Sequence, residues 1–513
     1  MMIPWHIPDS WSWVEASQIA QIVGGGTPRT DDPKNFENGD VPWITPADLS
    51  GYKDKYIARG TRNITKLGLA NSGARVMPAG TVLFSSRAPI GYVAIASNPI
   101  STNQGFKSFV LRPGIEKDYA YYYLMRARDL AIELSSGTTF REISGAKAAL
   151  IPFPVAPGAE QRRIVAEIEK QFTRLDAAVR ALKRVRANLK RYRAAILKAA
   201  AEGRLVPTEA ELARREGRSY EPASALLDRI LAERRARSEG THKRGTKKYL
   251  EPGAPGFANN FPLPEGWAPA DVEQVSSLVQ YGSSAKTNET PEGIPVLRMG
   301  NLTVDGRLDT SELKYLPKEH EEFPQLLLQD GDLLFNRTNS AELVGKSAVF
   351  RGNPNPCSFA SYLIRVKMIP GCDARYVAIC LNSSLGRKWI KSVVSQQVGQ
   401  ANVNGTKLQA FLFPLPPEPE QLSILAEVER RQSILDEQEI ALEKEIMRAE
   451  RLRQSILKSA FEGRLLPQDP NDEPASALLE RIPGAANLGR APVSEEGDKS
   501  NPRLVVPKET VHA

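Results

Sequence analysis

The chain has 513 residues, of which 41% are hydrophobic and 25% are charged, with a formal net charge of +8 and a pI near 9.2. This length accommodates three or four domain-sized units, and the positive charge favours a polyanionic partner, with nucleic acid the first candidate. The three cysteines form no CxxC pair and no stretch approaches 18 apolar residues, which argues against a disulfide framework, a zinc site and a membrane span. Because the N-terminus does not resemble a signal peptide, we expect a cytoplasmic protein without a membrane partner.

Residues 1–155 are predicted to form a first mixed α/β domain. It opens with Ile-Pro-Asp-Ser-Trp at residues 7–11. Short β-branched and aromatic runs, separated by glycine and proline turns, indicate strands, and a helix is expected near 118–134. The predicted strands are 81–84, 92–96 and 106–111.

Residues 156–235 are predicted to form a helical spacer with one very long helix. Pro157 and Glu160 mark its start, and Gly203 with a proline four residues later marks its end. About 43 residues at about 1.5 Å each make a rod of roughly 65 Å. Apolar residues recur every seven positions, which is typical of a coiled coil and requires a partner helix. This heptad seam consists of Ile168, Leu175, Leu182, Leu189 and Ile196.

The second half of the chain has the same order of elements. Residues 236–261 are rich in Arg, Lys, Gly and Pro and are predicted to be a solvated basic linker, with a phosphate contact as the alternative. A second mixed α/β domain is expected at 262–415, a second helical spacer at 416–482 and a disordered tail at 483–513. The second domain should have strands at 333–336, 347–350 and 363–368 and a helix near 373–394. The second seam consists of Val428, Leu435, Leu442, Ala449 and Ile456.

This order reflects an internal duplication. Residues 151–207 and 411–467 align without a gap and are identical at 24 of 57 positions, whereas average residue usage predicts about 3 or 4. A two-fold relation between the halves would make the two long helices antiparallel partners that hold the domains at opposite ends. Two helices packed separately on local cores are the alternative. The predicted fold class is therefore α+β, with two mixed α/β domains joined by two long antiparallel coiled-coil helices and a pseudo-two-fold internal duplication.

A catalytic centre is not predicted. Residues 345–347, Gly-Lys-Ser, end like a Walker A loop, but Ser340 replaces its first glycine. Gly24–Gly26 lack dinucleotide-binding spacing and are predicted to form a flexible surface loop. The four histidines lie far apart, so no metal site is expected, and an Asp-Glu-Lys triplet within 309–314 is what chance provides in such a charged chain. The sequence also lacks the Asn-Pro-Pro-aromatic tetrapeptide of adenine methyltransferases. We therefore expect a non-catalytic protein.

Polar and basic side chains interleaved with aromatic residues are the candidate DNA contacts. Arg and Lys suit guanine edges and phosphates, whereas Asn and Gln suit adenine edges. A solvated surface, or an interface with another subunit, is the alternative for each residue. The candidates are Thr27, Arg29, Ser86, Arg87, Asn103, Lys107 and Arg141 in the first domain, and Arg298, Asn301, Arg337, Asn339, Lys346, Gln397 and Gln400 in the second.

Several short motifs occur together with the duplication. They are the Ile-Pro or Leu-Pro-x-x-Trp openers, Gly-Gly-Thr-Pro at 25–28, Gly-Asp-Val-Pro-Trp-Ile-Thr at 39–45, Ser-Arg-Ala-Pro-Ile-Gly at 86–91, Asn-Gln-Gly-Phe-Lys at 103–107, and a Glu-Gln long-helix unit that ends Ile-Leu-Lys-x-Ala-x-x-Gly-Arg-Leu. In this combination the chain resembles the specificity subunit of type I restriction-modification enzymes over about residues 5–482. The second domain departs from the pattern, with Asn-Arg-Thr at 336–338 and no Asn-Gln-Gly-Phe-Lys.

The resemblance implies a function. In that family each variable domain is a target recognition domain for one half of a bipartite DNA site, and the helices form a spacer that docks two modification (DNA methyltransferase) subunits. The implied partners are double-stranded DNA, those two subunits and restriction/translocase subunits. This chain would hold no cofactor, since S-adenosylmethionine, ATP and Mg would belong to the partner subunits. The alternatives are a stand-alone DNA-modifying enzyme with an unrecognised active site and a coiled-coil scaffold that binds only protein.

Overall fold

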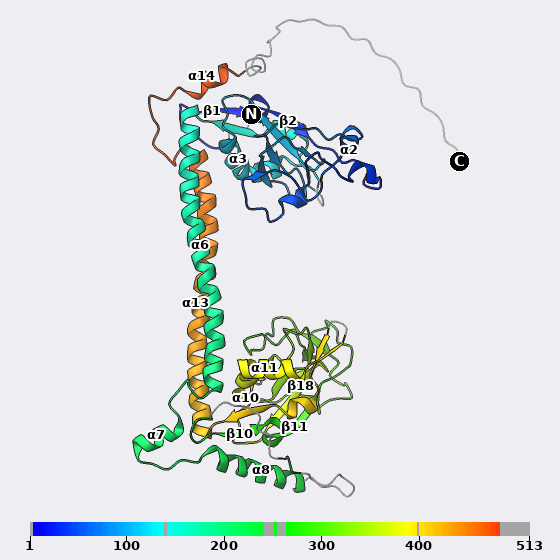
Figure 1. Cartoon of the computed structure of the whole chain (residues 1–513), viewed down its shortest axis with the longest axis vertical. Coiled ribbons are helices and arrows are strands. Elements are labelled where there is room, and N and C mark those ends of the chain that lie inside the picture. Colours follow the sequence, from blue (N-terminus) through cyan, green and yellow to red (C-terminus); the bar gives the residue numbers. More distant parts are fainter. Residues whose placement is uncertain (1–3, 138–140, 241–250, 254–262, 398–399, 483–513) are drawn as a thin grey trace, which may run out of the picture. The chain divides into compact units, whose positions relative to one another are not determined.

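The computed structural model describes residues 4–137, 141–240, 251–253, 263–397 and 400–482, without the side chains of 238–240 and 396–397. The chain divides into two compact units (Figure 1). The first comprises Met1–Arg180 with Ile446–Ala513, and the second comprises Ala181–Glu445. Each unit therefore contains parts of both sequence repeats. The predicted tail and most of the predicted linker lie outside the described residues.

The first unit contains a small mixed domain. Its strands are β1 (Ser12–Glu15), β2 (Ala20–Gly24), β3 (Trp43–Ile44), β4 (Tyr56–Ile57), β5 (Val82–Phe84), β6 (Val93–Ala96), β7 (Ser101–Thr102), β8 (Lys107–Leu111) and β9 (Pro152–Val155). Its short helices are α1 (Ala16–Ile19), α2 (Lys66–Ala70), α3 (Lys117–Arg126), α4 (Arg128–Leu134), α5 (Gly145–Ala149) and α14 (Ala475–Glu480), with 3-10 turns at Pro33–Asn35 and Pro46–Leu49. The main sheet has the order β2-β8-β5-β6-β4, and β1 pairs with β9. The three predicted strands are confirmed, and the predicted helix is divided into α3 and α4 at Ala127.

The second unit contains the related domain. Its strands are β10 (Ala268–Asp271), β11 (Ser276–Tyr281), β12 (Ile294–Leu297), β13 (Lys314–Leu316), β14 (Leu333–Asn336), β15 (Thr338–Asn339), β16 (Ser347–Val349), β17 (Ser358–Phe359), β18 (Leu363–Met368), β19 (Ser395–Gln397), β20 (Gln400–Asn402) and β21 (Leu412–Leu415). Its short helices are α7 (Glu209–Glu216), α8 (Ala223–Gly240), α9 (Val272–Val275), α10 (Ala374–Asn382), α11 (Ser384–Val393) and α12 (Gly405–Gln409). The main sheet has the order β11-β18-β14-β16, and β10 pairs with β21 as β1 does with β9.

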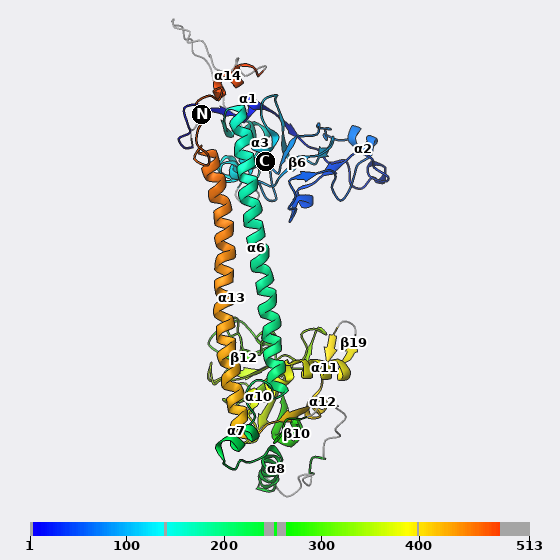
Figure 2. The same cartoon turned by 60° about the vertical axis from the view of Figure 1, so that its left-hand side comes forward.

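Two long helices, α6 (Gly158–Ala201) and α13 (Glu418–Phe461), follow the two domains (Figures 1 and 2). Each has 44 residues, close to the prediction, and would be about 66 Å long. The predicted stop signals hold, because Gly203 and Gly463 adopt φ angles of 65° and 67°, a conformation that a glycine tolerates after a helix end.

The heptad residues of the long helices are not equally buried. Those near the helix ends are covered by the neighbouring domain as well as by the facing helix, whereas Leu182 and Leu442, near the middle of each helix, are only half-buried. The buried members are Ile168, Leu189, Ile196, Val428, Leu435 and Ile456, and Leu175 packs at the edge of the first core. The seam thus contributes most to packing where it meets a domain.

Ion pairs confirm the predicted antiparallel order. The pairs are Asp176–Arg453 in the first unit, and Arg186–Glu443 (2.8 Å) and Arg193–Asp436 (2.9 Å) in the second. In the second unit the residue number therefore rises along α6 while it falls along α13. Arg453 lies 260 positions after Arg193, and Asp436 lies 260 positions after Asp176, so the duplication has preserved one ion pair in two copies.

A buried carboxylate joins each domain to its long helix. Glu160 in α6 accepts a hydrogen bond from the indole N–H of Trp11, and Glu420 in α13 accepts one from Trp267, both at 2.9 Å. Each glutamate is only 1% exposed. Burial raises the pKa of Glu160 and raises the pKa of Glu420 to about 7, although the indole hydrogen bonds favour the ionised form.

The glutamine after each carboxylate extends this junction to the domain backbone. Gln161 Oε1 accepts the Glu116 N–H at 2.9 Å, and Gln421 Oε1 accepts the Asp373 N–H at 2.8 Å. Their side-chain amides donate to backbone carbonyls, that of Ala156 in the first unit and those of Gly371 and Pro416 in the second. The Glu-Gln dipeptides therefore fix the angle at which the chain leaves each domain and enters the helix.

The segment after each long helix packs on the domain of the other repeat. In the second unit the Glu209 N–H donates to Glu420 at 2.9 Å, and in the first the Gln468 side chain donates to Glu160 at 2.7 Å. The duplicated contacts include Ala223 N–H to Gly266 O (2.7 Å) and Ala475 N–H to Ser10 O (2.9 Å). Each unit is therefore completed by residues of both repeats.

The predicted start of the basic linker at residue 236 is wrong. Helix α8 continues to Gly240, into the segment that was expected to be a linker. Its sequence from 231 onward is rich in Ala, Arg and Glu, which favour helix, and Arg237 pairs with Glu233 one turn earlier at 2.6 Å.

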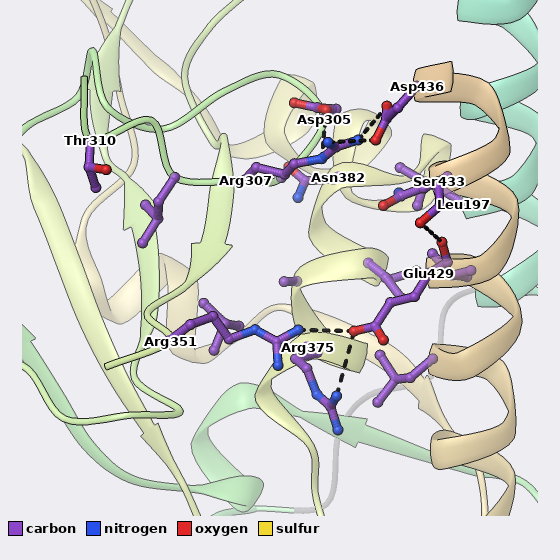
Figure 3. Close-up of a pocket in the computed structure, with 18 of the residues that line it drawn as sticks. Leu197, Asp305, Arg307, Thr310, Arg351, Arg375, Asn382, Glu429, Ser433 and Asp436 are labelled. Atoms are coloured by element: carbon purple, nitrogen blue, oxygen red, sulfur yellow. Dashed lines mark hydrogen bonds and ion pairs between the residues drawn. The ribbon is translucent and has the colours of Figure 1, made fainter. Parts of the chain in front are cut away.

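A cleft of about 650 Å³ lies between the second domain and α13 (Figure 3). Arg351 and Arg375 reach across it to Glu429, at 2.9 and 3.6 Å, and Arg307 reaches Asp436 at 2.7 Å. Figure 3 shows these groups on opposite sides of the opening. The second domain is therefore attached to the helix by charges on both sides of the cleft.

The first unit has an equivalent cleft of about 500 Å³. Its lining residues on α6 are Glu169, Phe172, Thr173 and Asp176, which lie 260 positions before four residues that line the second cleft: Glu429, Gln432, Ser433 and Asp436. Lys55 bridges it by contacting Glu169 and, at 2.7 Å, Asp118. The position of the helix carboxylate is thus preserved, whereas its partner changes from a lysine to two arginines.

The raised pKa of Glu420 predicts a pH-dependent stability of the second unit. The folded carboxyl has a pKa of about 7, above its ordinary value of 4.5, so the folded state binds more protons than the unfolded state between these values. The wild type should lose stability relative to Glu420→Gln as the pH rises from about 4.5 to about 7, by at most about 3 kcal/mol. Urea unfolding of both proteins across this range measures the difference, and a difference that is constant with pH would contradict the prediction.

Candidate nucleic-acid interface

Four loops meet at one end of the main sheet of the first domain. We call residues 25–29, 85–88, 103–107 and 141–143 the first loop cluster. The ends of β2 and β5 lie beside the start of β8, because these strands pair antiparallel. Backbone hydrogen bonds connect the loops, from Gly26 N–H to Thr102 O (2.9 Å), from Ser86 N–H to Gly105 O (2.7 Å), and from Ile143 N–H to Ser86 O (3.1 Å).

The Gly-Gly stretch is tightly packed, which corrects the prediction of a flexible surface loop. A Cβ atom on Gly25 would lie 2.0 Å from the backbone oxygen of Asn103, and one on Gly26 would lie 2.3 Å from the Ala74 nitrogen. Such distances are shorter than any van der Waals contact, so only glycine fits. The glycines therefore allow the loop after β2 to lie directly against the turn before β8.

Two cations share one carboxylate in the first loop cluster. Lys107 Nζ lies 3.5 Å from Glu142 Oε1, and Arg87 Nη1 lies 3.4 Å from Glu142 Oε2. Lys107 also donates to the backbone oxygen of Gln104 at 3.3 Å, and the Gln104 side chain accepts a hydrogen bond from the Thr27 hydroxyl. Since two positive groups face a single negative group, this corner has an excess of positive charge.

The second domain builds the same backbone frame. We call residues 282–286, 336–340, 360–362 and 400–403 the second loop cluster. Its connecting bonds run from Ser283 N–H to Phe359 O (2.9 Å), from Arg337 N–H to Tyr362 O (3.0 Å), and from Val403 N–H to Arg337 O (2.9 Å). Arg337 therefore occupies the backbone position of Ser86, and Tyr362 that of Gly105.

The side chains on this frame differ from those of the first cluster. The Arg337 guanidinium lies over the Tyr281 ring, 4.8 Å from its centroid, and its Nη2 is 3.4 Å from Asn402 Oδ1. Asn402 lies 260 positions after Glu142, so an amide replaces the shared carboxylate. Tyr281 and Tyr362 are 43% and 48% exposed. The two clusters have the same backbone arrangement but different surface side chains, as expected of two sites that bind different ligands.

Several predicted contacts lie on these clusters. In the first, Arg87 and Lys107 surround Glu142, Thr27 contacts Gln104, and Asn103 accepts the Gly105 N–H at 2.9 Å. The other candidates there are Arg29, which pairs with Asp31 at 3.0 Å, and the exposed Arg141. In the second, Arg337 is joined by the half-buried Asn339 and the exposed Gln400, whereas the Gln397 side chain lies outside the described residues. Their contact with DNA stays a prediction.

Three of the predicted contacts have side chains that are buried inside the domains, which argues against a direct contact with DNA. Ser86 belongs to the first loop cluster, but it is fully buried. Asn301 accepts the Arg298 N–H at 2.8 Å and donates to backbone oxygens of Asp309 and Glu312, so it holds a loop. Lys346 donates to the carbonyls of Met299 (3.0 Å) and Leu302, and burial lowers its pKa. Arg298, next to this loop, is half-buried and keeps its status as a candidate.

Sequence reasoning missed Glu142, Tyr281, Tyr362 and Asn402. The only available signal was the 260-residue offset, which relates Glu142 to Asn402 but says nothing about what either side chain faces. Among the described residues, no group of three or more His, Cys, Asp or Glu side chains could hold a metal ion. No helix in the described part of the chain is both long and apolar enough to cross a membrane.

Comparisons with known proteins agree with this architecture. A family model of the type I restriction modification DNA specificity domain matches residues 8–185. The specificity subunit of the type I restriction enzyme MjaIX of Methanocaldococcus jannaschii is 41% identical over 161 residues, which are 31% of this chain and 37% of that protein. The EcoKI specificity subunit of Escherichia coli K12 is 25% identical over 494 residues, 93% of this chain and 95% of that protein.

A solved structure from work on complex assembly and conformational transition of the type I R-M system has the same fold. It is 18% identical and gives a TM-score of 0.57 over 90% of this chain and 100% of that chain. Residues 8–185 therefore match the type I restriction modification DNA specificity domain, and the chain over nearly its whole length is similar to specificity subunits of type I restriction enzymes.

Proposed function

We propose that this chain is the DNA-recognition subunit of a type I restriction-modification complex and that it recognises a bipartite, asymmetric DNA site. The observation that carries this proposal is the pair of loop clusters, which share one backbone frame and present different side chains. Each cluster would read one half-site. The relatives that align with the chain are named as specificity subunits of such enzymes, which supports the assignment.

The remaining activities of the complex are assigned to other subunits. We propose that two DNA methyltransferase subunits dock on this chain and that restriction subunits join them. S-adenosylmethionine, ATP and Mg would then be bound by those partners, and this chain would be non-catalytic. Because the substrate is chromosomal or invading DNA, the complex would work in the cytoplasm.

The two alternatives can be distinguished by experiment. A scaffold that binds only protein would leave the complex without salt-sensitive, sequence-specific DNA binding. A stand-alone DNA-modifying enzyme would turn over DNA without partner subunits. The family relationship supports neither alternative.

Exchange of one domain should change one half-site. We expect that replacing residues 12–150 by the corresponding segment of another specificity subunit alters one half of the methylated site and leaves the other half unchanged. The reason is that the first loop cluster lies within this segment, whereas Trp11, Glu160 and the two long helices are retained. Genome-wide methylation mapping gives both halves at once, and a simultaneous change in both would contradict modular recognition.

Removal of a cation and removal of the shared carboxylate in the first loop cluster should change DNA binding in opposite directions. Lys107→Ala should weaken binding of the complex to all DNA sequences and lower the salt slope by about one unit, because a phosphate contact is lost. Glu142→Gln should strengthen it, because Arg87 and Lys107 lose their neutralising partner. Duplex binding titrations at several salt concentrations measure both variants. If neither variant changes the salt slope of DNA binding from that of the wild type, this surface belongs to a subunit interface and does not contact DNA.

A further inference from the structure

The two loop clusters hold their cations in different ways. In the first, the Lys107 ammonium is a point charge that contacts Glu142, the Ser86 hydroxyl and the Gln104 backbone carbonyl. In the second, the cation comes from the turn after β14, and its planar guanidinium lies against the face of an aromatic ring. The residue that pairs with position 107 across the sheet is Gly24 in the first domain, whereas Tyr281 occupies the corresponding end of β11 in the second.

Tyr281 is itself fixed at both ends. It is the last residue of β11, and its backbone pairs with Ile364 of β18. Its hydroxyl accepts a hydrogen bond from the Gly405 N–H at 2.7 Å. The ring is therefore immobilised although it is 43% exposed. A guanidinium stacked on such a ring keeps its plane, because the face of the ring attracts the cation and restricts its rotation.

Arg337 has donors to spare in this position. Its Nη2 makes only a long hydrogen bond, 3.4 Å, to Asn402, and among the described residues its buried Nε has no hydrogen-bond partner. A guanidinium has five N–H donors in a rigid fork, and because the Arg337 Nε is buried, its two terminal nitrogens are the donors that a ligand can reach. The arrangement thus suits a ligand that offers two acceptors in one plane.

We propose that Arg337 reads a guanine in the second half-site and that Tyr281 is the positioning residue that holds its guanidinium in plane. This inference rests on the proposed function and names the base class that one of its readers recognises. Guanine presents O6 and N7 as two coplanar acceptors in the major groove, and Arg is the side chain that matches them with two hydrogen bonds. A phosphate can also accept two hydrogen bonds from a guanidinium, but such a contact would strengthen binding to all sequences alike, so the base preference distinguishes the two.

The test uses the whole complex, with this chain and its modification subunits, and a library of duplex DNA with randomised sequence. Bound duplexes are sequenced to give a base-preference profile for both half-sites. Arg337→Ala should reduce the preference for guanine at one position of one half-site by between about 5-fold and about 150-fold. Arg337→Lys, which retains the charge, should lose this preference while it keeps binding to non-specific DNA.

Tyr281 is tested by matched substitutions. Tyr281→Leu, which removes the ring face, should reduce the same guanine preference by about 2- to 5-fold, and Tyr281→Phe should restore most of it. In an Arg337→Ala background, Tyr281→Leu should have no additional effect on the profile, because its influence acts through Arg337. A purely structural tyrosine would give additive effects. Thermal unfolding of each complex shows that the variants remain folded.

Arg351→Ala is the control, since it removes one positive charge from the same domain at a residue that pairs with Glu429 of α13. Its profile should equal that of the wild type. The proposal is overturned if Arg337→Ala leaves the profile unchanged, or if it weakens all sequences equally while lowering the salt slope by about one, which marks a phosphate contact. If the wild-type complex selects no sequence at all, the proposed function itself has failed.

Discussion

The buried hydrogen bond between a tryptophan and a glutamate is the interaction on which the rest of the architecture depends. Glu160 and Glu420 start the long helices, and each is enclosed so completely that its carboxylate must find partners inside the protein. Trp11 and Trp267 supply one hydrogen bond each. Rotation of a domain on its helix would break this bond and leave a buried carboxylate oxygen unpaired, so each domain leaves its helix at a fixed angle.

The second hydrogen bond to each carboxylate explains why both repeats are needed. Gln468 supplies it to Glu160, and the Glu209 N–H supplies it to Glu420, so the segment after one long helix completes the junction at the start of the other. Each compact unit therefore contains parts of both repeats. The ion pair of Asp176 with Arg453, and its copy at Arg193, shows the same exchange within the helix pair.

The sequence predicted the elements that depend on local pattern and failed where contacts come from distant residues. Heptads and glycine stops define the long helices, because helix periodicity is local. By contrast, Lys346 has the composition of a surface residue, yet the loop at 299–302 covers it and accepts its hydrogen bonds. Similarly, Glu142 joins Arg87 and Lys107 only because three separate loops meet at one sheet end. Residue type and spacing do not predict such contacts between loops that are distant in the sequence.

We propose that one backbone frame, present in two copies, forms two DNA-recognition sites that act independently of each other. The most direct test is a chain in which residues 263–415 are replaced by residues 7–155, so that both positions carry the first domain and both retain a tryptophan for the buried glutamate. Assembled with its modification subunits and mapped by genome-wide methylation, this chain should recognise a site made of two copies of the first half-site. Methylation of the original asymmetric site by the folded, active complex would contradict the account.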